Sequence, residues 1–405
     1  MLANILFVDD EIQILNALKR MLRGKRDEWN CFFADGGASA LEFLSQKDFD
    51  VVVSDMRMPG MDGAQLLKEI HKKFPATIRI ILSGFAEENS ILNTISSAHQ
   101  YLAKPCDKDQ LINTLTRALS LRTYLDKTTA NCIIGKMTKL PTLPDTLKEL
   151  MDEIDSPNSN INRLDDIVSK DIALTAQTLR ITNSAFFGVP VEVTSPGEAI
   201  RFLGIDTFRS IALSAGIFKE LVHDRNIQQR SEKLNQNCME IGALATKICQ
   251  REGTDIRTTN FAKSASTLSH IGTLILMSEW GEIYDQLLAV LDTNGGFLVY
   301  EESRAFGVSH AELGAYVLGL WGFPDPIVEA VAFHHCPSKA DNSEFGPLAI
   351  LHVAQCLVCR DFDANNLDAI DTSKLDLEYL ERVGVMGKLK DWSSLLESVR
   401  NVGRG

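Results

Sequence analysis

The sequence has a deficit of positive charge. Its 405 residues include 41 Lys and Arg against 54 Asp and Glu, which gives a formal net charge of −13 at pH 7. A surface that follows the phosphates of DNA or RNA needs clustered basic residues, and the sequence shows no helix-turn-helix pattern. We therefore expect no nucleic-acid partner, which argues against a transcription factor.

Long hydrophobic runs and paired cysteines are also missing. The N-terminus reaches Asp9, Asp10 and Glu11 before a secretory apolar stretch is complete, and no later run approaches membrane-spanning length. The eight cysteines are scattered and give no disulfide framework. Cys356 and Cys359 form the only C-x-x-C pair, which we interpret as core packing. We expect a cytoplasmic protein without a membrane partner.

Polar residues follow short apolar runs at four places in the first 105 residues. Each run resembles a buried strand, and the side chains that follow can bind a cation or a phosphoryl group: Asp9 and Asp10 after 5–8, Asp55 after 51–54, Ser83 after 78–82, and Lys104 after 101–103. In a parallel α/β sheet these strand ends meet at one edge. Three acids there suit a hard divalent cation, and a hydroxyl and an ammonium group complete the surroundings of a transferred phosphoryl group.

With this spacing, residues 1–121 resemble a response-regulator receiver domain. The resemblance implies a flavodoxin-like α/β fold with a five-stranded parallel sheet and Asp55 as phosphoacceptor. It also implies bound Mg²⁺, held directly by Asp10 and Asp55, through water by Asp9, and by the main-chain carbonyl of Arg57. Any one of these acids alone could simply cap a loop or helix; their joint spacing favours the site.

The same resemblance implies roles for three later residues. Lys104 would pair with the phosphoryl oxygens, and Ser83 would move in to hydrogen-bond them. Tyr101 would follow Ser83 inward as an aromatic switch. The Lys104–Pro105 peptide bond would be cis, a geometry that proline makes accessible.

The length and composition indicate further domains after the receiver-like part. The last receiver helix should begin after Asp107 and run on past the domain. The segment 140–145 should end one element and start a helix with Asp145 as its N-cap. We expect a receiver domain, a helical connector, an output domain and a C-terminal helical extension packed on it, at 1–121, 122–137, 138–340 and 341–405.

Helical periodicity dominates the output region. An ordered series of motifs there resembles the HDOD domain: LPTLP at 140–144, DIALT at 171–175, TNSAFFG at 182–188, SPGEAI at 195–200 and FLG at 202–204. The resemblance implies a mostly α-helical module related to HD phosphohydrolases and to HD-GYP cyclic-di-GMP phosphodiesterases.

The ligands of an active HD site are largely replaced in this chain. A working site gathers His and Asp side chains around divalent metals, with an adjacent His-Asp pair at its centre. Ser269 and His270 stand in place of that pair, and Gln355 stands where an acid is expected. The sequence after His335 is Cys-Pro-Ser instead of the Gly-Tyr-Pro loop. We therefore do not expect an enzyme.

Two interpretations of the remaining histidines stay open. His270, His310, His334 and His335, with His352 as a further candidate, could form a vestigial or altered HD metal site. They could instead be buried side chains hydrogen-bonded to their neighbours. The second is favoured, because imidazoles without a carboxylate make a poor hydrolytic centre for hard metals.

The combined expectation is a phosphorelay response regulator. A sensor histidine kinase or phosphotransfer protein would phosphorylate Asp55 and so switch the protein contacts of a catalytically inactive HDOD domain. The downstream partner is open, with a cyclic-di-GMP enzyme as one candidate, and so is a homodimer. The alternatives are a metal-dependent HD-type phosphohydrolase acting on cyclic-di-GMP or a nucleotide, and an inactive HD-GYP-like regulator of an active phosphodiesterase.

Overall fold

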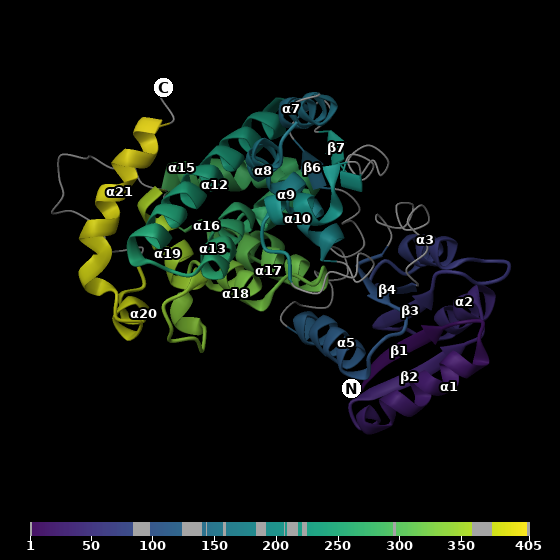
Figure 1. Cartoon of the computed structure of the whole chain (residues 1–405). Coiled ribbons are helices and arrows are strands. Elements are labelled where there is room, and N and C mark those ends of the chain that lie inside the picture. Colours follow the sequence, from purple (N-terminus) through teal and green to yellow (C-terminus); the bar gives the residue numbers. More distant parts are fainter. Residues whose placement is uncertain are drawn as a thin grey trace.

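The N-terminal region is a parallel sheet with strand order β2-β1-β3-β4-β5. The computed structural model describes residues 2–83, 98–123, 140–142, 144–156, 159–183, 192–205, 207–208, 218–220, 225–294, 297–358 and 375–402. The strands are β1 (Ala3–Val8), β2 (Trp29–Ala34), β3 (Val51–Asp55), β4 (Ile78–Ser83) and β5 (Gln100–Ala103). The expected flavodoxin-like sheet is confirmed (Figure 1).

Helices cover both faces of this sheet, and the two-residue period of the strands explains why. Ile5 and Phe7 of β1 belong to one apolar cluster, while Leu6 and Val8 belong to the other. The first cluster includes residues of α1 (Ile12–Met21) and α5 (Lys108–Thr123), and the second includes residues of α2 (Gly37–Gln46) and α3 (Gly63–Lys73). A strand buried on both faces therefore reads as a continuous apolar run.

The register of the strands brings the polar residues to one edge. Val8 of β1 pairs with Ser54 of β3, so Asp9, just after β1, lies beside Asp55, the last residue of β3. Ser83 pairs with Ala103, which places Lys104 just beyond β5. The Lys104–Pro105 bond is cis, as the resemblance implied.

The C-terminal region is mostly helical, as expected from the sequence. Its helices are α7 (Pro144–Asp155), α8 (Ile161–Ser169), α9 (Ile172–Thr182), α10 (Pro196–Leu203), α12 (Arg225–Glu252), α13 (Ile256–Leu268), α14 (Ile271–Glu279), α15 (Gly281–Asn294), α16 (Leu298–Phe306), α17 (His310–Leu320), α18 (Asp325–Phe333) and α19 (Pro347–Val358). The strands β6 (Leu140–Thr142) and β7 (Phe218–Glu220) form a small parallel pair. No helix among the described residues is long and apolar enough to cross a membrane.

Several motif residues of this region act as helix caps. The side chain of Asp171 accepts from the backbone N–H of Leu174 at the start of α9, and Ser195 caps α10 in the same way. Gly197 approaches Asp165 so closely that an added Cβ would lie 2.9 Å from its carboxyl carbon. The expected N-cap at Asp145 is wrong, because α7 already begins at Pro144, a residue well suited to the first helical turn.

The C-terminal helices α20 (Leu377–Arg382) and α21 (Leu389–Val402) follow residues 359–374, which lie outside the described part. Helix α21 packs along α12 and also contacts α19. Trp392 is fully buried and its indole N–H donates to Glu252 at 2.8 Å. Trp392 is therefore a core residue of this region.

The two regions meet where α5 lies against the helical region (Figure 1). Helix α5 packs against α17, and Arg117 of α5 forms an ion pair with Asp325 at 2.8 Å and a hydrogen bond to the carbonyl of Phe323. The expected boundary at residue 121 lies inside α5, and most of the expected connector, 122–137, lies outside the described residues.

A second part of the contact surrounds Arg180 of α9. Its guanidinium donates to the carbonyl of Ala98 at 2.5 Å and lies 4.7 Å from the centre of the Trp321 ring. Gly322 has a positive φ of 80°, and an added Cβ would lie 2.9 Å from the side-chain nitrogen of Gln100. The approach of the two regions thus depends on a glycine that has no substitute free of strain.

Candidate functional site

Lys104 joins two carboxylates at the sheet edge. Its ammonium group donates to Asp9 at 2.8 Å and forms a short hydrogen bond to Asp55. Asp9 also accepts from the backbone N–H of Glu11 at 2.9 Å, and Asp55 accepts from that of Arg57 at 2.7 Å. Both carboxylates are buried, and these bonds hold them beside a cation.

The turn after β3 depends on Gly63. A Cβ at this position would lie 2.1 Å from the carbonyl oxygen of Asp55, so only glycine allows α3 to start this close to the strand. The side chain of Asp62 caps α3 by accepting from the backbone N–H of Gln65, and the side-chain oxygen of Gln65 accepts from the backbone N–H of Asp62. The local sequence therefore fixes the end of β3, and with it the position of Asp55.

The environment shifts the pKa values of this pair. Burial raises the pKa of Asp55, and the hydrogen bond and charge of Lys104 offset part of that rise. Burial disfavours the charged form of Lys104, but its bonds to Asp55 and Asp9 outweigh this and leave its pKa raised. Lys104 is thus held as a cation between the two acids.

The remaining residues of the expected set lie around this centre. Asp10 and the Arg57 side chain are exposed, and Tyr101 is buried in β5. The three carboxylates of Asp9, Asp10 and Asp55 do not converge to within 4.8 Å of one another. Ser83 ends β4, but its side chain lies outside the described part.

The donor chemistry of this edge fits Mg²⁺. Carboxylate and carbonyl oxygens are the ligands that Mg²⁺ prefers. The position that Lys104 takes between Asp9 and Asp55 also shows that their charges favour a cation there. The structure brings Asp9, Asp55 and Lys104 into contact. Asp10 directly follows Asp9 in the sequence, and Arg57 follows Asp55 by two residues.

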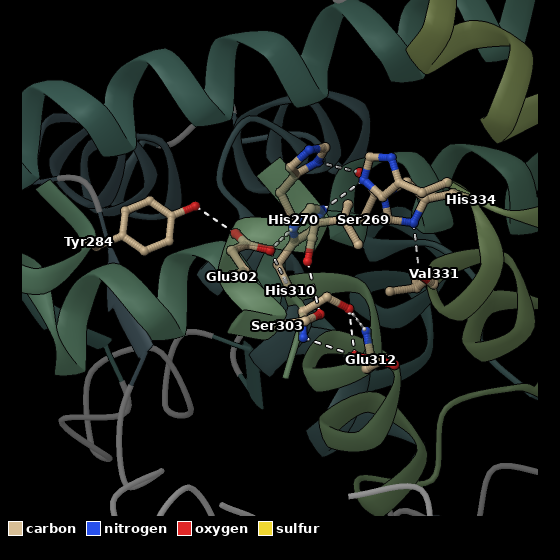
Figure 2. A network of polar contacts seen from close by, with 12 residues as sticks. Ser269, His270, Tyr284, Glu302, Ser303, His310, Glu312, Val331 and His334 are labelled. Atoms are coloured by element: carbon tan, nitrogen blue, oxygen red, sulfur yellow. Dashed lines mark hydrogen bonds and ion pairs between the residues drawn. The ribbon is translucent and has the colours of Figure 1, made fainter. Parts of the chain in front are cut away.

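Three histidines of the helical region converge in its core (Figure 2). One ring nitrogen from each of His270, His310 and His334 lies within 4.8 Å of the other two, and all three residues are buried. His270 precedes α14, His310 begins α17, and His334 follows α18. Residues far apart in sequence therefore meet at three helix ends.

A buried carboxylate lies behind His310. Glu302 has no exposed surface, and it accepts from the ring Nδ1 of His310 at 2.5 Å and from its backbone N–H at 2.8 Å. The hydroxyl of Tyr284 donates to the same carboxylate at 2.7 Å, and burial together with this negative neighbour raises the pKa of that hydroxyl (Figure 2). Glu302 and Tyr284 are not predicted from the sequence, because nothing local marks them as buried.

Burial keeps His270, His334 and His335 neutral, and His352 is fully hydrogen-bonded. Burial and the neighbouring rings lower the pKa of His270 to about 3 and hold that of His334 and His335 below the usual range. His335 lies 2.9 Å from His310 and 3.4 Å from Gln355. His352 bonds to the carbonyl of His334 and accepts from the backbone of Asp376, so its two ring nitrogens are both used.

Comparisons with known proteins agree with this two-part architecture. Residues 5–116 match the family model of the response regulator receiver domain, and residues 140–337 match that of the HDOD domain. The DNA-binding transcriptional regulator NtrC of Escherichia coli is 38% identical over 114 residues, 28% of this chain and 24% of NtrC. An uncharacterized protein of Treponema pallidum is 22% identical over 244 residues, 60% of this chain and 46% of that protein.

Two solved structures are similar to parts of the chain. The signal receiver domain of an HD domain-containing protein from Pseudomonas fluorescens Pf-5 is 32% identical, with a TM-score of 0.29, and the match covers 31% of this chain and 99% of that one. The MmoQ response regulator of Methylococcus capsulatus is 22% identical, with a TM-score of 0.46, over 63% of this chain and 98% of that one. The chain spans a quarter to about half of the length of the curated relatives above. It contains a response regulator receiver domain followed by an HDOD domain.

Proposed function

We propose that this chain is a phosphorelay response regulator in which phosphorylation of Asp55 switches the protein contacts of the HDOD domain. The observation that carries the proposal is the buried carboxylate of Asp55 at the sheet edge, hydrogen-bonded to Lys104 beside Asp9. A sensor histidine kinase or phosphotransfer protein would be the donor.

The chemistry follows from this geometry. A carboxylate oxygen of Asp55 attacks phosphorus, the bond from phosphorus to the donor's histidine nitrogen breaks, and an acyl phosphate forms. Lys104 then turns its ammonium group from the carboxylates to the phosphoryl oxygens, and Ser83 donates a hydrogen bond to them. Mg²⁺ held by Asp9, Asp10, Asp55 and the carbonyl of Arg57 would supply the remaining positive charge.

The contact between the two regions supports a direct route for the switch. Tyr101 of β5 lies near Arg180, where its phenol partly offsets the burial that lowers the arginine pKa to about 10. Arg180 also bonds to Ala98, two residues before β5. A movement of Tyr101 after phosphorylation would therefore act on the HDOD domain at α9.

The histidine cluster supports a binding domain without hydrolytic activity. Its three converging side chains are buried, and no carboxylate is among them. A hydrolytic metal centre must admit a substrate and activate a bound water, whereas Glu302 is used by His310 and Tyr284. We infer that the output is a protein contact, with a cyclic-di-GMP enzyme as one candidate partner.

The first experiment labels the protein with a small phosphoryl donor and Mg²⁺. Wild-type protein should take up one hydroxylamine-sensitive phosphoryl group, and Asp55→Asn should take up none. Asp27→Asn, which changes an exposed acid of the same domain, is the matched control and should be labelled normally. Labelling of Asp55→Asn, or a hydroxylamine-resistant label, would remove the assignment.

A second experiment tests the switch. Beryllofluoride, which stands in for the phosphoryl group, should alter amide exchange in β5 and also in α9 and α17. A pull-down with beryllofluoride-treated and Asp55→Asn protein should then recover different partners. Changes confined to the receiver would show that the two domains are only tethered.

A third experiment tests the output. Purified protein should not hydrolyse cyclic-di-GMP with manganese or iron supplied. Turnover that disappears in His334→Ala would instead establish the phosphohydrolase alternative.

A further inference from the structure

The protons of the histidine cluster can be assigned from its hydrogen bonds. His334 Nδ1 lies 2.8 Å from the carbonyl oxygen of Val331, which can only accept, so the ring proton is on Nδ1. The lone pair of His334 is therefore on Nε2. This atom is buried and has no hydrogen-bond partner.

The other two rings also make a contact through Nδ1. The hydroxyl of Ser269 donates to the carbonyl of Ser266 at 2.8 Å, so it accepts from His270 Nδ1 at 2.9 Å. His310 Nδ1 donates to the carboxylate of Glu302. In each ring Nδ1 therefore contacts a neighbouring group, which leaves Nε2 as the nitrogen available to a ligand.

A positive group between the three rings would be stabilised by the lone pairs of their Nε2 atoms. Nε2 of His310 lies 2.9 Å from Nε2 of His335, and a bound ion would take the place of this contact. His334 Nε2 still lacks a donor. An unpaired buried nitrogen loses the full free energy of its hydration, so a ligand that accepts lone pairs would be strongly favoured here.

The negative charge of Glu302 also favours a cation in this cluster. Its donors among the described residues are the hydroxyl of Tyr284 and the backbone and ring N–H groups of His310, and none of these is a permanent cation. A fully buried carboxylate is costly unless a positive charge compensates it. A carboxylate bonded to the outer nitrogen of a ligating histidine is the usual second shell of a metal site.

We propose that Nε2 of His270, His310 and His334 binds one transition-metal ion of the Zn²⁺ class, at a closed site that fastens three helix ends together. Imidazole nitrogens select such ions over Mg²⁺. Around one ion the nitrogens would lie about 3.4 Å apart, so the rings need to approach by up to about 1.4 Å from the observed limit of 4.8 Å.

This set differs from the His-Asp set of active HD relatives. Ser269 and His270 replace the central pair, and His270 supplies an imidazole where those relatives have a carboxylate. With neutral ligands and no carboxylate contact the ion has a structural role. It joins the loop before α14, the start of α17 and the end of α18.

The test is the metal content of the full chain. Mass spectrometry of purified protein should find about one transition-metal ion per chain, and cobalt exchanged into the site should give the visible absorption of a nitrogen-ligated ion. X-ray absorption should show nitrogen neighbours at about 2.0–2.1 Å. A sulfur neighbour would instead implicate Cys238, whose Sγ is 3.7 Å from His270, and would overturn the three-histidine set.

Two variants sharpen the result. His334→Ala should lose the ion and unfold at a lower temperature, while His335→Ala should keep the ion. His71→Ala is the matched control, because His71 also has a buried ring nitrogen without a partner but lies alone on α3 of the receiver. Wild-type protein with much less than one ion per chain, no cobalt spectrum and no thermal shift with chelator would overturn the proposal, even if His334→Ala fails to fold.

Discussion

The acid cluster of the receiver and the histidine cluster of the HDOD domain handle charge in opposite ways. In the receiver, two carboxylates share a cation that the chain itself supplies, Lys104, at an edge where Asp10 is exposed. In the HDOD domain, Glu302 and three imidazoles are buried in the core, and the described donors to Glu302 are Tyr284 and His310. In the receiver, a cation from solvent can replace Lys104 beside the two carboxylates. In the HDOD domain, burial prevents such an exchange at Glu302 and the three imidazoles.

The largest effect is expected where the sealed charge is removed. Glu302→Ala should lower the free energy of unfolding of the HDOD domain by about 4 kcal/mol, because it leaves buried donors of Tyr284 and His310 without an acceptor. Urea unfolding followed by circular dichroism measures the change. Glu282→Ala, at an exposed position of α15, is the control, and equal effects of the two changes would contradict the contrast between sealed and open charge.

The next effect concerns the contact between the two regions. Arg180→Ala should cost about 3 kcal/mol, because it opens a cavity beside Trp321 and leaves the carbonyl of Ala98 without its donor. Arg180→Met should recover most of this stability by refilling the space, yet still weaken the response of α9 to beryllofluoride. Differential scanning calorimetry and amide exchange check the two parts; Arg201→Ala, on the exposed side of α10, should change neither.

A smaller effect is expected at the open site. Lys104→Met removes a cation that competes with Mg²⁺ for Asp9 and Asp55, so Mg²⁺ should bind about tenfold more tightly. Isothermal titration calorimetry measures the affinity, and Lys108→Met, at an exposed position of α5, serves as control. Weaker or unchanged Mg²⁺ binding in Lys104→Met would mean that Lys104 and Mg²⁺ do not compete for Asp9 and Asp55.

The smallest effect is expected for the peripheral ion pair between the regions. Asp325 is 88% exposed, so solvent screens its bond to Arg117. Arg117→Ala should lower the free energy of unfolding by less than about 1 kcal/mol, and Asp325→Ala by still less, because Arg117 also bonds to the carbonyl of Phe323. A loss as large as that of Arg180→Ala would place the main contact at α5 instead of α9.

The sequence was most informative where structure and chemistry are set by neighbours in the chain. The run that ends in Asp55 is a buried strand followed by a capped helix, and parallel topology carries its end to the same edge as Asp9. The receiver fold and the order of its polar residues were therefore predictable. The contact between Lys104 and both acids follows from the same rule.

Other features depend on partners far away in the chain. Glu302 follows the half-buried Glu301 and precedes the exposed Arg304 in the same helix, and only folding shows that it meets Tyr284 and His310. The strand β6 holds only three residues, including Pro141, and pairs with β7 almost eighty residues later, so local turn signals concealed it. Arg180 likewise has no local mark of its burial against Ala98.

Strand β5 is a short physical link between the Asp55 site and the contact with the HDOD domain at Arg180. The chain takes six steps from Ala98, which Arg180 of the HDOD domain holds, to Lys104, which bonds Asp55. At about 3.3 Å per residue this segment reaches at most about 20 Å. Any displacement of Lys104 would be delivered to the output domain by one nearly inextensible segment, so the length and composition of residues 124–139 could change without altering that reach.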